Sequence, residues 1–298
     1  MNFEKYQHIA RMGTPSVDGI LKGEVYVFPK VDGANGSVFK KGEEIVACSR
    51  RRVLSEEENN KGFYNYVQEN ENIKKLLEKH PNFRMFGEWL TKRTIKGYNE
   101  DAWKKFYVFD VIDTEKGENS YLKYEEYLPI LENFGILHIP LITKLENPSF
   151  EEVKELIPES DNFLLKEGEK GEGIVVKNYD FTNRYGERVW GKFVADTFDC
   201  GSKPKPKNLR NYSFEIQLAD KTMDAHFVKK EFLRFKDQKG GFEKKMIGEM
   251  LEYIFDVFLK EEAYNVLIEI GEKPFQLHPF KKVVFAKIRE SLPEIFEK

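Results

Sequence analysis

Lys30 is a candidate nucleophile in this sequence. It follows an apolar run that ends in proline, YVFP, and one residue separates it from Asp32 and Gly33 in the stretch KVDG. Residues 26–28 and 37–39 favour extended structure, and the Asp-Gly and Asn-Gly pairs between them favour a turn. The pattern predicts two strands of a hairpin with a lysine at its mouth. Because an exposed turn lysine gives the same pattern, other residues must decide its role.

Charged side chains recur inside or at the ends of apolar, strand-like stretches further along the chain. The stretches are ACSRRR, RMFGEWL, KFYVFDV, KGEGIVVKNYD and RVWGKFVAD. Burying a carboxylate costs on the order of several kcal/mol unless it is paired or hydrogen-bonded, so such positions need an explanation. The charged residues are Arg50, Glu88, Asp110, Glu172, Lys177 and Lys192.

Each of these residues, taken singly, could be a strand-end group facing water or a lysine that protects a sheet edge from aggregation. Together with the aromatic Phe109 they are what a nucleotide phosphate site needs. Lysine and arginine neutralise phosphate charge, carboxylates hold Mg²⁺ or a ribose, and an aromatic face stacks on a base. One conflict remains. Glu172 and Lys177 are five residues apart, which places them on opposite faces of a regular strand unless a bulge intervenes.

The first two thirds of the chain alternates irregularly between strand and helix patterns, which predicts an α+β domain and argues against a doubly wound parallel sheet. The predicted strands are 25–29, 37–40, 44–48, 83–90, 106–112, 173–177 and 188–194. The predicted helices of this region are 63–79, 121–134 and 149–157.

The pattern becomes helical after the Pro- and Lys-rich stretch GSKPKPKN, with apolar stripes at helical spacing in 244–259 and 280–291. We therefore predict two domains, 1–203 and an all-α domain 204–298. The net charge of −3 gives no overall footprint for nucleic acid, although short basic clusters are present. With only Cys48 and Cys200, and no apolar run of membrane-spanning length or signal-peptide type, the composition favours a cytoplasmic protein.

The order and spacing of these stretches resemble the successive motifs of the covalent nucleotidyltransferases, the superfamily of ATP- and NAD-dependent ligases and mRNA capping enzymes. FGEW, FYVFD and EGIVVK are most similar to the ATP-dependent RNA ligases of the RNA ligase 2 type. The resemblance covers roughly residues 20–200. It implies a ligase-type domain of antiparallel sheets with flanking helices, unrelated to the ATP-grasp fold.

The resemblance also implies an activity, and it implies which residues would react with or contact the nucleotide. Lys30 would attack the α-phosphate of ATP and carry AMP, which would pass to the 5′-phosphate of an RNA and leave when a 3′-hydroxyl attacks. Arg50 would contact the phosphate or ribose, and Phe109 would stack on adenine. Lys177 and Lys192 would contact the phosphates.

The remaining roles concern the metal and the sealing step. Asp32, Glu88 and Glu172 would hold Mg²⁺, or Mn²⁺ in its place, through water, and Glu88 could instead bind the ribose. Asn35 would support sealing, and Asp110 would support the pocket.

One position departs from the family pattern. The last motif usually has two lysines one residue apart, but Val194 occupies the second place here. Either Lys192 serves both purposes, or a lysine of the stretch 203–207 contributes.

The expected chemistry imposes a constraint. A free lysine has a pKa of about 10.4, whereas attack requires the neutral amine. Nearby carboxylates raise the pKa of a lysine, and a divalent cation beside the amine would oppose them. We therefore expect one Mg²⁺ near Lys30 and a second on the departing pyrophosphate.

Three alternatives stay open at this level. A capping guanylyltransferase would carry a C-terminal OB barrel, which the helical pattern disfavours. A DNA ligase and a non-catalytic RNA-binding module are the others, although binding alone requires no nucleophile. The sequence indicates no obligate protein partner. It does not distinguish a nicked duplex, a broken tRNA loop and single strands as substrate.

Overall fold

The chain divides into two compact units. A computed structural model describes residues 2–7, 9–91, 97–117, 120–184, 186–195, 213–223, 225–271 and 275–296. The first unit comprises Met1–Gly13 and Val17–Phe193, and the second comprises Thr14–Ser16 and Val194–Lys298. The boundary predicted near residue 203 lies outside the described residues.

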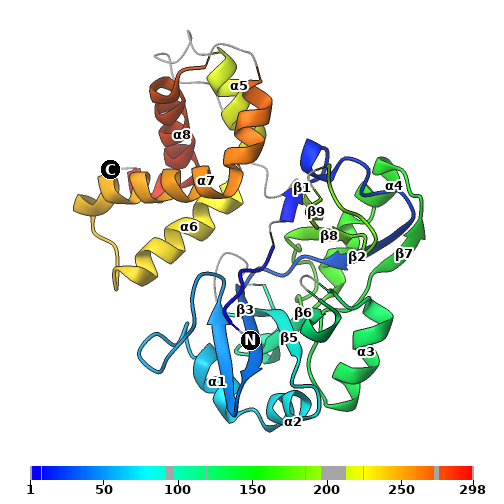
Figure 1. Ribbon diagram of the computed structural model, residues 1–298. Helices are drawn as coiled ribbons and strands as arrows, with labels where there is room; N and C mark the ends of the chain where they lie inside the picture. The colour runs from blue at the N-terminus through cyan, green and yellow to red at the C-terminus, as the bar shows by residue number, and fades with distance from the viewer. Residues whose placement is uncertain are drawn as a thin grey trace. The chain divides into compact units, whose positions relative to one another are not determined.

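Two β-sheets form the centre of the first unit (Figure 1). The strands of the first sheet are β1 (Ile9–Arg11), β2 (Glu24–Pro29), β7 (Thr143–Glu146), β8 (Gly173–Lys177) and β9 (Trp190–Val194). Those of the second are β3 (Ala34–Lys41), β4 (Glu44–Ser49), β5 (Phe83–Trp89) and β6 (Phe106–Asp113). Their orders are β1-β9-β8-β2-β7 and β4-β3-β5-β6. Strand β2 is antiparallel to β7 and β8, the second sheet is antiparallel throughout, and β1 is parallel to β9.

The consecutive strands β2 and β3 belong to different sheets, so the predicted hairpin is wrong. Strand β2 pairs with β7 and β8, whereas β3 pairs with β4 and β5. Asp-Gly and Asn-Gly pairs predict a local change of direction, but they do not determine which strand becomes the neighbour. Residues 30–33 therefore carry the chain from one sheet to the other, and Lys30 lies at this crossing.

Alternation along the strands separates core residues from site residues. In β2, Val25 and Val27 pack in one apolar cluster with Ile174 and Val176 of β8. Successive side chains of a strand point to opposite faces, so Phe28 lies on the other face. All seven predicted strand segments contain a strand of the structure. Strands β1 and β7 were not predicted, because one has three residues and the other, TKLE, has little apolar content.

Helices flank the sheets of this unit. They are α1 (Phe63–Glu69), α2 (Glu71–Lys79), α3 (Tyr124–Asn133) and α4 (Phe150–Lys154). The single helix predicted over 63–79 is wrong, because Asn70 has extended φ and ψ of −85° and 101°. Its side chain accepts a hydrogen bond from the Ile73 N–H, so Asn70 caps the start of α2.

The described elements of the second unit after residue 212 are helices, as predicted. They are α5 (Ser213–Thr222), α6 (Ala225–Gln238), α7 (Ile247–Ile270), α8 (Leu277–Ser291) and α9 (Pro293–Phe296). The two apolar stripes found in the sequence supply much of one buried core, including Ile254, Phe258, Phe280 and Val284. An α+β unit followed by an all-α region confirms the predicted fold class. Among the helices of the described ranges, none has the length and apolarity to cross a membrane.

Candidate active site

A pocket that opens to solvent lies between the two sheets of the first unit, and the space among its lining residues, part of it open solvent, is about 470 Å³. The first sheet contributes Phe28 and Val175, and the second contributes side chains opposite them. The structure brings five of the predicted site residues into its lining, namely Lys30, Asn35, Glu88, Phe109 and Lys177.

Backbone contacts hold the crossing segment that carries Lys30. The Lys30 N–H donates to the Gly173 carbonyl at 2.8 Å, which joins the segment to the start of β8. The Asp32 N–H donates to the Tyr98 hydroxyl at 2.9 Å, and the Gly33 N–H donates to Glu88 Oε1 at 2.9 Å. Glu88 therefore anchors the loop in addition to lining the pocket.

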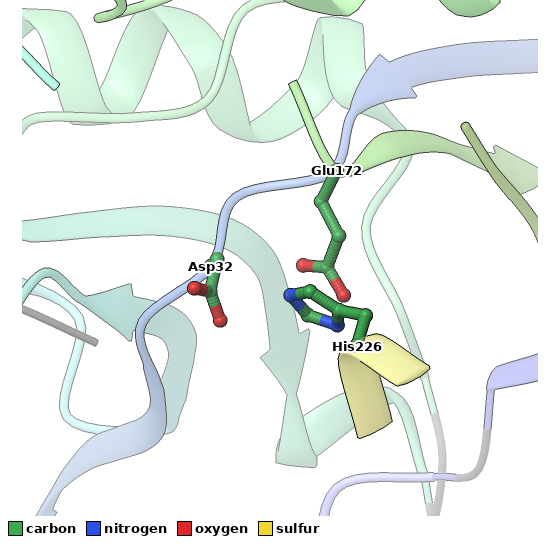
Figure 2. A group of neighbouring side chains, drawn as sticks. All are labelled: Asp32, Glu172 and His226. Carbon is green, nitrogen blue, oxygen red and sulfur yellow. The ribbon is translucent and has the colours of Figure 1, made fainter. Parts of the chain in front are cut away.

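The Lys30 amine is paired with Glu172. Lys30 Nζ lies 2.6 Å from Glu172 Oε2, and a carboxylate oxygen of Asp32 lies within 4.8 Å of one of Glu172. In Figure 2, Asp32 extends from the segment after β2 and Glu172 from the segment before β8; His226, also drawn, belongs to the second unit. The two carboxylates therefore converge near the amine from separate segments.

These carboxylates change the pKa of Lys30. Burial lowers the pKa of the amine, but the charges of Glu172, Glu88 and Asp32 outweigh burial and raise it above its ordinary value. A raised pKa of Lys30 is what the sequence analysis expected from nearby carboxylates. At neutral pH, without other charges, the amine is therefore protonated and cannot attack.

Gly173 resolves the conflict between Glu172 and Lys177. Strand β8 begins at Gly173, whose φ of +135° lies outside the range that residues with a Cβ readily adopt. Glu172 is therefore not part of the regular alternation and can pair with Lys30. Within the strand, Val175 and Lys177 share the face that lines the pocket, as their spacing of two requires.

A β-bulge places Phe109 in the pocket. Phe86 of β5 pairs with Asp110 and the next residue, Gly87, pairs with Val108, so Phe109 is the extra residue of β6. Bulges redirect side chains and are frequent beside functional sites. The irregularity lets the adjacent residues Phe109 and Asp110 both take part in the arrangement around the pocket.

Asp110 organises a buried polar network behind Phe109. Lys177 Nζ donates to Asp110 Oδ1 at 2.8 Å and to the Phe109 carbonyl at 2.6 Å. Asp110 Oδ2 accepts hydrogen bonds from the Tyr6 hydroxyl at 2.5 Å and from the Trp190 indole at 3.2 Å. Asp110 therefore holds the amine of Lys177 against the residue expected to stack on a base.

The other predicted site residues lie at different distances from this arrangement. Asn35 is directly opposite Glu88 in the β3–β5 pairing, so the two share one face. Arg50 and Lys192 are not among the described residues that line the pocket. Arg50 follows Ser49, which pairs with Gly36 next to Asn35.

Lys192 lies two residues after Trp190 and so shares its face of β9. The lysines of 203–207 lie outside the described residues.

Sequence reasoning missed three residues of the site. Tyr6 lines the pocket, Tyr98 accepts from the crossing segment, and Gly173 redirects the chain before β8. A glycine at the start of a strand is a recognisable signal of an unusual backbone. The two tyrosines gave no signal, because nothing in their neighbourhood distinguishes them from core aromatics.

Comparison with known proteins identifies the family of the chain. The family model described as RNA ligase matches residues 23–194, which is more than half of the chain. The chain belongs to the RNA ligase family. No curated protein matches it.

Solved structures of an RNA ligase from Naegleria gruberi are similar. The structure of that enzyme with PPi has a TM-score of 0.51 and 24% identity. A mutant of that enzyme in its apo form has a TM-score of 0.51 and 23% identity, and another mutant, with AMP and Mn, has a TM-score of 0.51 and 22% identity. Each match covers 66% of this chain and 57% of the Naegleria chain. The likeness shows a shared fold over that part.

The crossing segment should tolerate no side chain at Gly33. A Cβ there would lie 2.6 Å from the Trp89 carbonyl oxygen and 2.9 Å from Glu88 Cγ. Gly33→Ala should therefore destabilise the first unit by about 1–3 kcal/mol, the usual cost of overpacking. The thermal unfolding midpoint measures the effect. Gly248→Ala is the control, since its Cβ in α7 meets nothing within 4 Å and should stabilise that helix. Equal midpoints for Gly33→Ala and the wild type would contradict the close packing.

The pKa of Lys30 should fall in Glu172→Gln, because the largest charge that raises it is lost while the amine stays buried. The neutral amine should then persist to lower pH than in the wild type. The pH dependence of Lys30 acetylation by acetic anhydride, followed by mass spectrometry without metal or nucleotide, measures this shift. Glu71→Gln, at an exposed helix residue, is the matched control and should leave it unchanged. An unchanged or higher pKa in Glu172→Gln would refute the assignment of Glu172 as the main counter-ion.

Proposed function

We propose that this protein is an ATP-dependent RNA ligase that works through a covalent lysyl-AMP intermediate on Lys30. The observation that supports this most is the position of the Lys30 amine. It lines a pocket between two sheets together with an aromatic residue, Phe109, and a second lysine, Lys177. Membership of the RNA ligase family agrees with the proposal.

The reaction would have three steps. In each step one bond to phosphorus forms, to oxygen or nitrogen, and another bond to the same phosphorus breaks. The neutral Lys30 amine attacks the α-phosphorus of ATP, a P–N bond forms, pyrophosphate leaves, and the amine loses a proton. An oxygen of the RNA 5′-phosphate then attacks the AMP phosphorus, a P–O bond forms, the P–N bond breaks, and the Lys30 amine leaves with a proton. Finally a 3′-hydroxyl attacks the activated 5′-phosphate, loses its proton and displaces AMP. Positioning and charge stabilisation supply most of the catalysis of such transfers.

The pocket residues suit distinct parts of the nucleotide. The ring of Phe109, held by the bulge, would stack on adenine, and Asp110 would keep Lys177 beside it. Lys177 would contact phosphate from there. Glu88 would contact the ribose or a water bound to metal, and Asn35, directly opposite, would act in sealing.

Arg50 and Lys192 would act from the margin of the pocket. Arg50 would contact the phosphate or ribose beside Asn35. Lys192 would contact the phosphates from the face of β9 that also carries Trp190. The position of Arg50 directly after β4 and the alternation of side chains along β9 support these two roles.

The carboxylates near Lys30 fit a magnesium or manganese ion. Mg²⁺ prefers oxygen ligands and keeps several waters, and oxygens of Asp32 and Glu172 lie within 4.8 Å of each other. Asp32, Glu172 and Glu88 would hold the ion, with water between. Bound there, it would supply positive charge that lowers the pKa of Lys30 against the three carboxylates. Structures of the Naegleria RNA ligase with ATP and Mn agree with a divalent metal in this family.

The substrate would be RNA with 5′-phosphate and 3′-hydroxyl ends, in the cytoplasm, as part of RNA repair. A capping enzyme would require a C-terminal OB barrel, and the described elements after residue 212 are helices instead. A DNA ligase would share the nucleotide chemistry, and the matching family model favours RNA over DNA.

Lys30→Ala should abolish covalent labelling of the protein by ATP labelled in the α-phosphate, because the attacking amine is gone. It should still seal an RNA that already carries a 5′-adenylate, since that substrate bypasses the first step. Denaturing electrophoresis measures the label, and a gel shift of the RNA measures sealing.

Lys22→Ala is the matched control, because Lys22 is exposed and eight residues away in the same unit. It should label as the wild type does. Labelled GTP in place of ATP should give no adduct. Full labelling of Lys30→Ala, or wild-type labelling by GTP alone, would overturn the proposal.

A further inference from the structure

Arg84 is a fully buried arginine outside the site described above. It lies on β5, an inner strand of the second sheet, and its side chain is 2% exposed. It is directly opposite Phe39 in the β3–β5 pairing, and its guanidinium lies 4.3 Å from the centre of that ring. Burying an arginine is costly unless its donors are used, so the partners of this side chain indicate what it does.

The partners of Arg84 belong to the segment 2–6, far away in sequence. Nη1 donates to the Glu4 carbonyl at 3.4 Å, and Nη2 donates to the Asn2 carbonyl. The Glu4 carboxylate lies 3.6 Å from Nη1. One planar guanidinium therefore binds two carbonyls and a carboxylate of one segment, a geometry that suits arginine better than lysine.

This segment carries Tyr6 into the pocket. Tyr6 is 5% exposed, lines the pocket and packs against the rings of Phe86 and Phe109, with centroids 5.0 Å apart in both cases. Its hydroxyl donates to Asp110, the residue that holds Lys177. Arg84 and Phe86 lie two residues apart on the same face of β5. The contacts of Arg84 with the segment and of Phe86 with Tyr6 are therefore on one face of the sheet.

We propose that Arg84 is a positioning residue for the nucleotide: by clamping residues 2–6 it fixes Tyr6 as one wall of the pocket. This inference rests on the proposed function, because it takes the ligand to be the adenine nucleotide. Tyr6 contacts the edge of the pocket where Phe109 would stack on the base. Arg84 acts only through the segment, and its side chain does not line the pocket among the described residues.

The clamp can be tested without any activity. Lys5 is exposed and precedes Tyr6, so the protease Lys-C can cut after it only when the segment detaches. Arg84→Met keeps an unbranched stem and removes the donors. It should accelerate cleavage after Lys5 on the order of tenfold, since hydrogen bonds to a charged group are lost. Cleavage after Lys79, at the end of α2 in the same unit, should stay slow if the fold is intact.

The wall is tested by the kinetics of self-adenylylation. Arg84→Met and Tyr6→Ala should each raise the ATP KM about 3- to 10-fold, the effect of losing one aromatic contact, with little change in the saturating rate. Phe3→Ala is the matched control, because Phe3 is an aromatic of the same segment but is 37% exposed. It should leave KM unchanged. Tyr6→Ala keeps Arg84, so it decides the role of the wall even if Arg84→Met does not fold.

Each outcome decides a part of the proposal. Unchanged cleavage after Lys5 in folded Arg84→Met overturns the clamp. An unchanged KM in Tyr6→Ala, or an equal rise in Phe3→Ala, overturns the wall. If the wild type takes no label from ATP, the proposed function fails instead. In that case the wall is tested by adding ATP to the wild type and measuring Lys-C cleavage after Lys5. Slower cleavage with ATP would support Tyr6 as a wall of the pocket, and unchanged cleavage would contradict it.

Discussion

The ion pair between Lys30 and Glu172 is the interaction on which the arrangement of this site depends. It holds the amine at 2.6 Å from a carboxylate, in a pocket that also receives Phe109 and Lys177. The same contact keeps the amine protonated, because Glu172 raises its pKa. As the proposed nucleophile, the Lys30 amine is well placed in this pair but cannot attack while it is protonated. The proposed reaction therefore requires a positive charge that offsets the carboxylates, and Asp32 and Glu172 would hold it.

Three local departures from regular sheet structure make this pair and its pocket. The chain crosses between sheets at residues 30–33, which places Lys30 between them. Gly173, at φ +135°, directs Glu172 to the amine before β8 becomes regular. The bulge at Phe109 brings its ring into the pocket while Asp110 holds Lys177. The departures bring Lys30 and Phe109 into the pocket and pair Glu172 with Lys30, so the site is built at the ends and irregularities of strands that otherwise form the core.

Much of the fold follows from local patterns. Apolar and β-branched runs marked seven strands, and the 3.6-residue stripes around Ile254 and Val284 marked the C-terminal helices, because burial of a continuous face determines both. The charged candidate site residues, such as Glu88 and Asp110, were recognisable because they lie in apolar segments. The partners of those residues were not. Which strand lies beside β2, where the bulge falls, and why Arg84 and Tyr6 are buried all depend on contacts between distant segments, and such contacts leave no periodic signal in one sequence.

The most direct test of the central claim is the Mg²⁺ dependence of self-adenylylation in Glu172→Gln at saturating ATP, at neutral and at raised pH. Loss of the carboxylate alone lowers the pKa of Lys30 and would by itself favour reaction. If Glu172 also holds the cation, the variant should nevertheless react more slowly, need more Mg²⁺ to saturate, and recover partly at raised pH as more amine becomes neutral. A variant that reacts at least as fast as the wild type at neutral pH, with an unchanged Mg²⁺ requirement, would contradict the account.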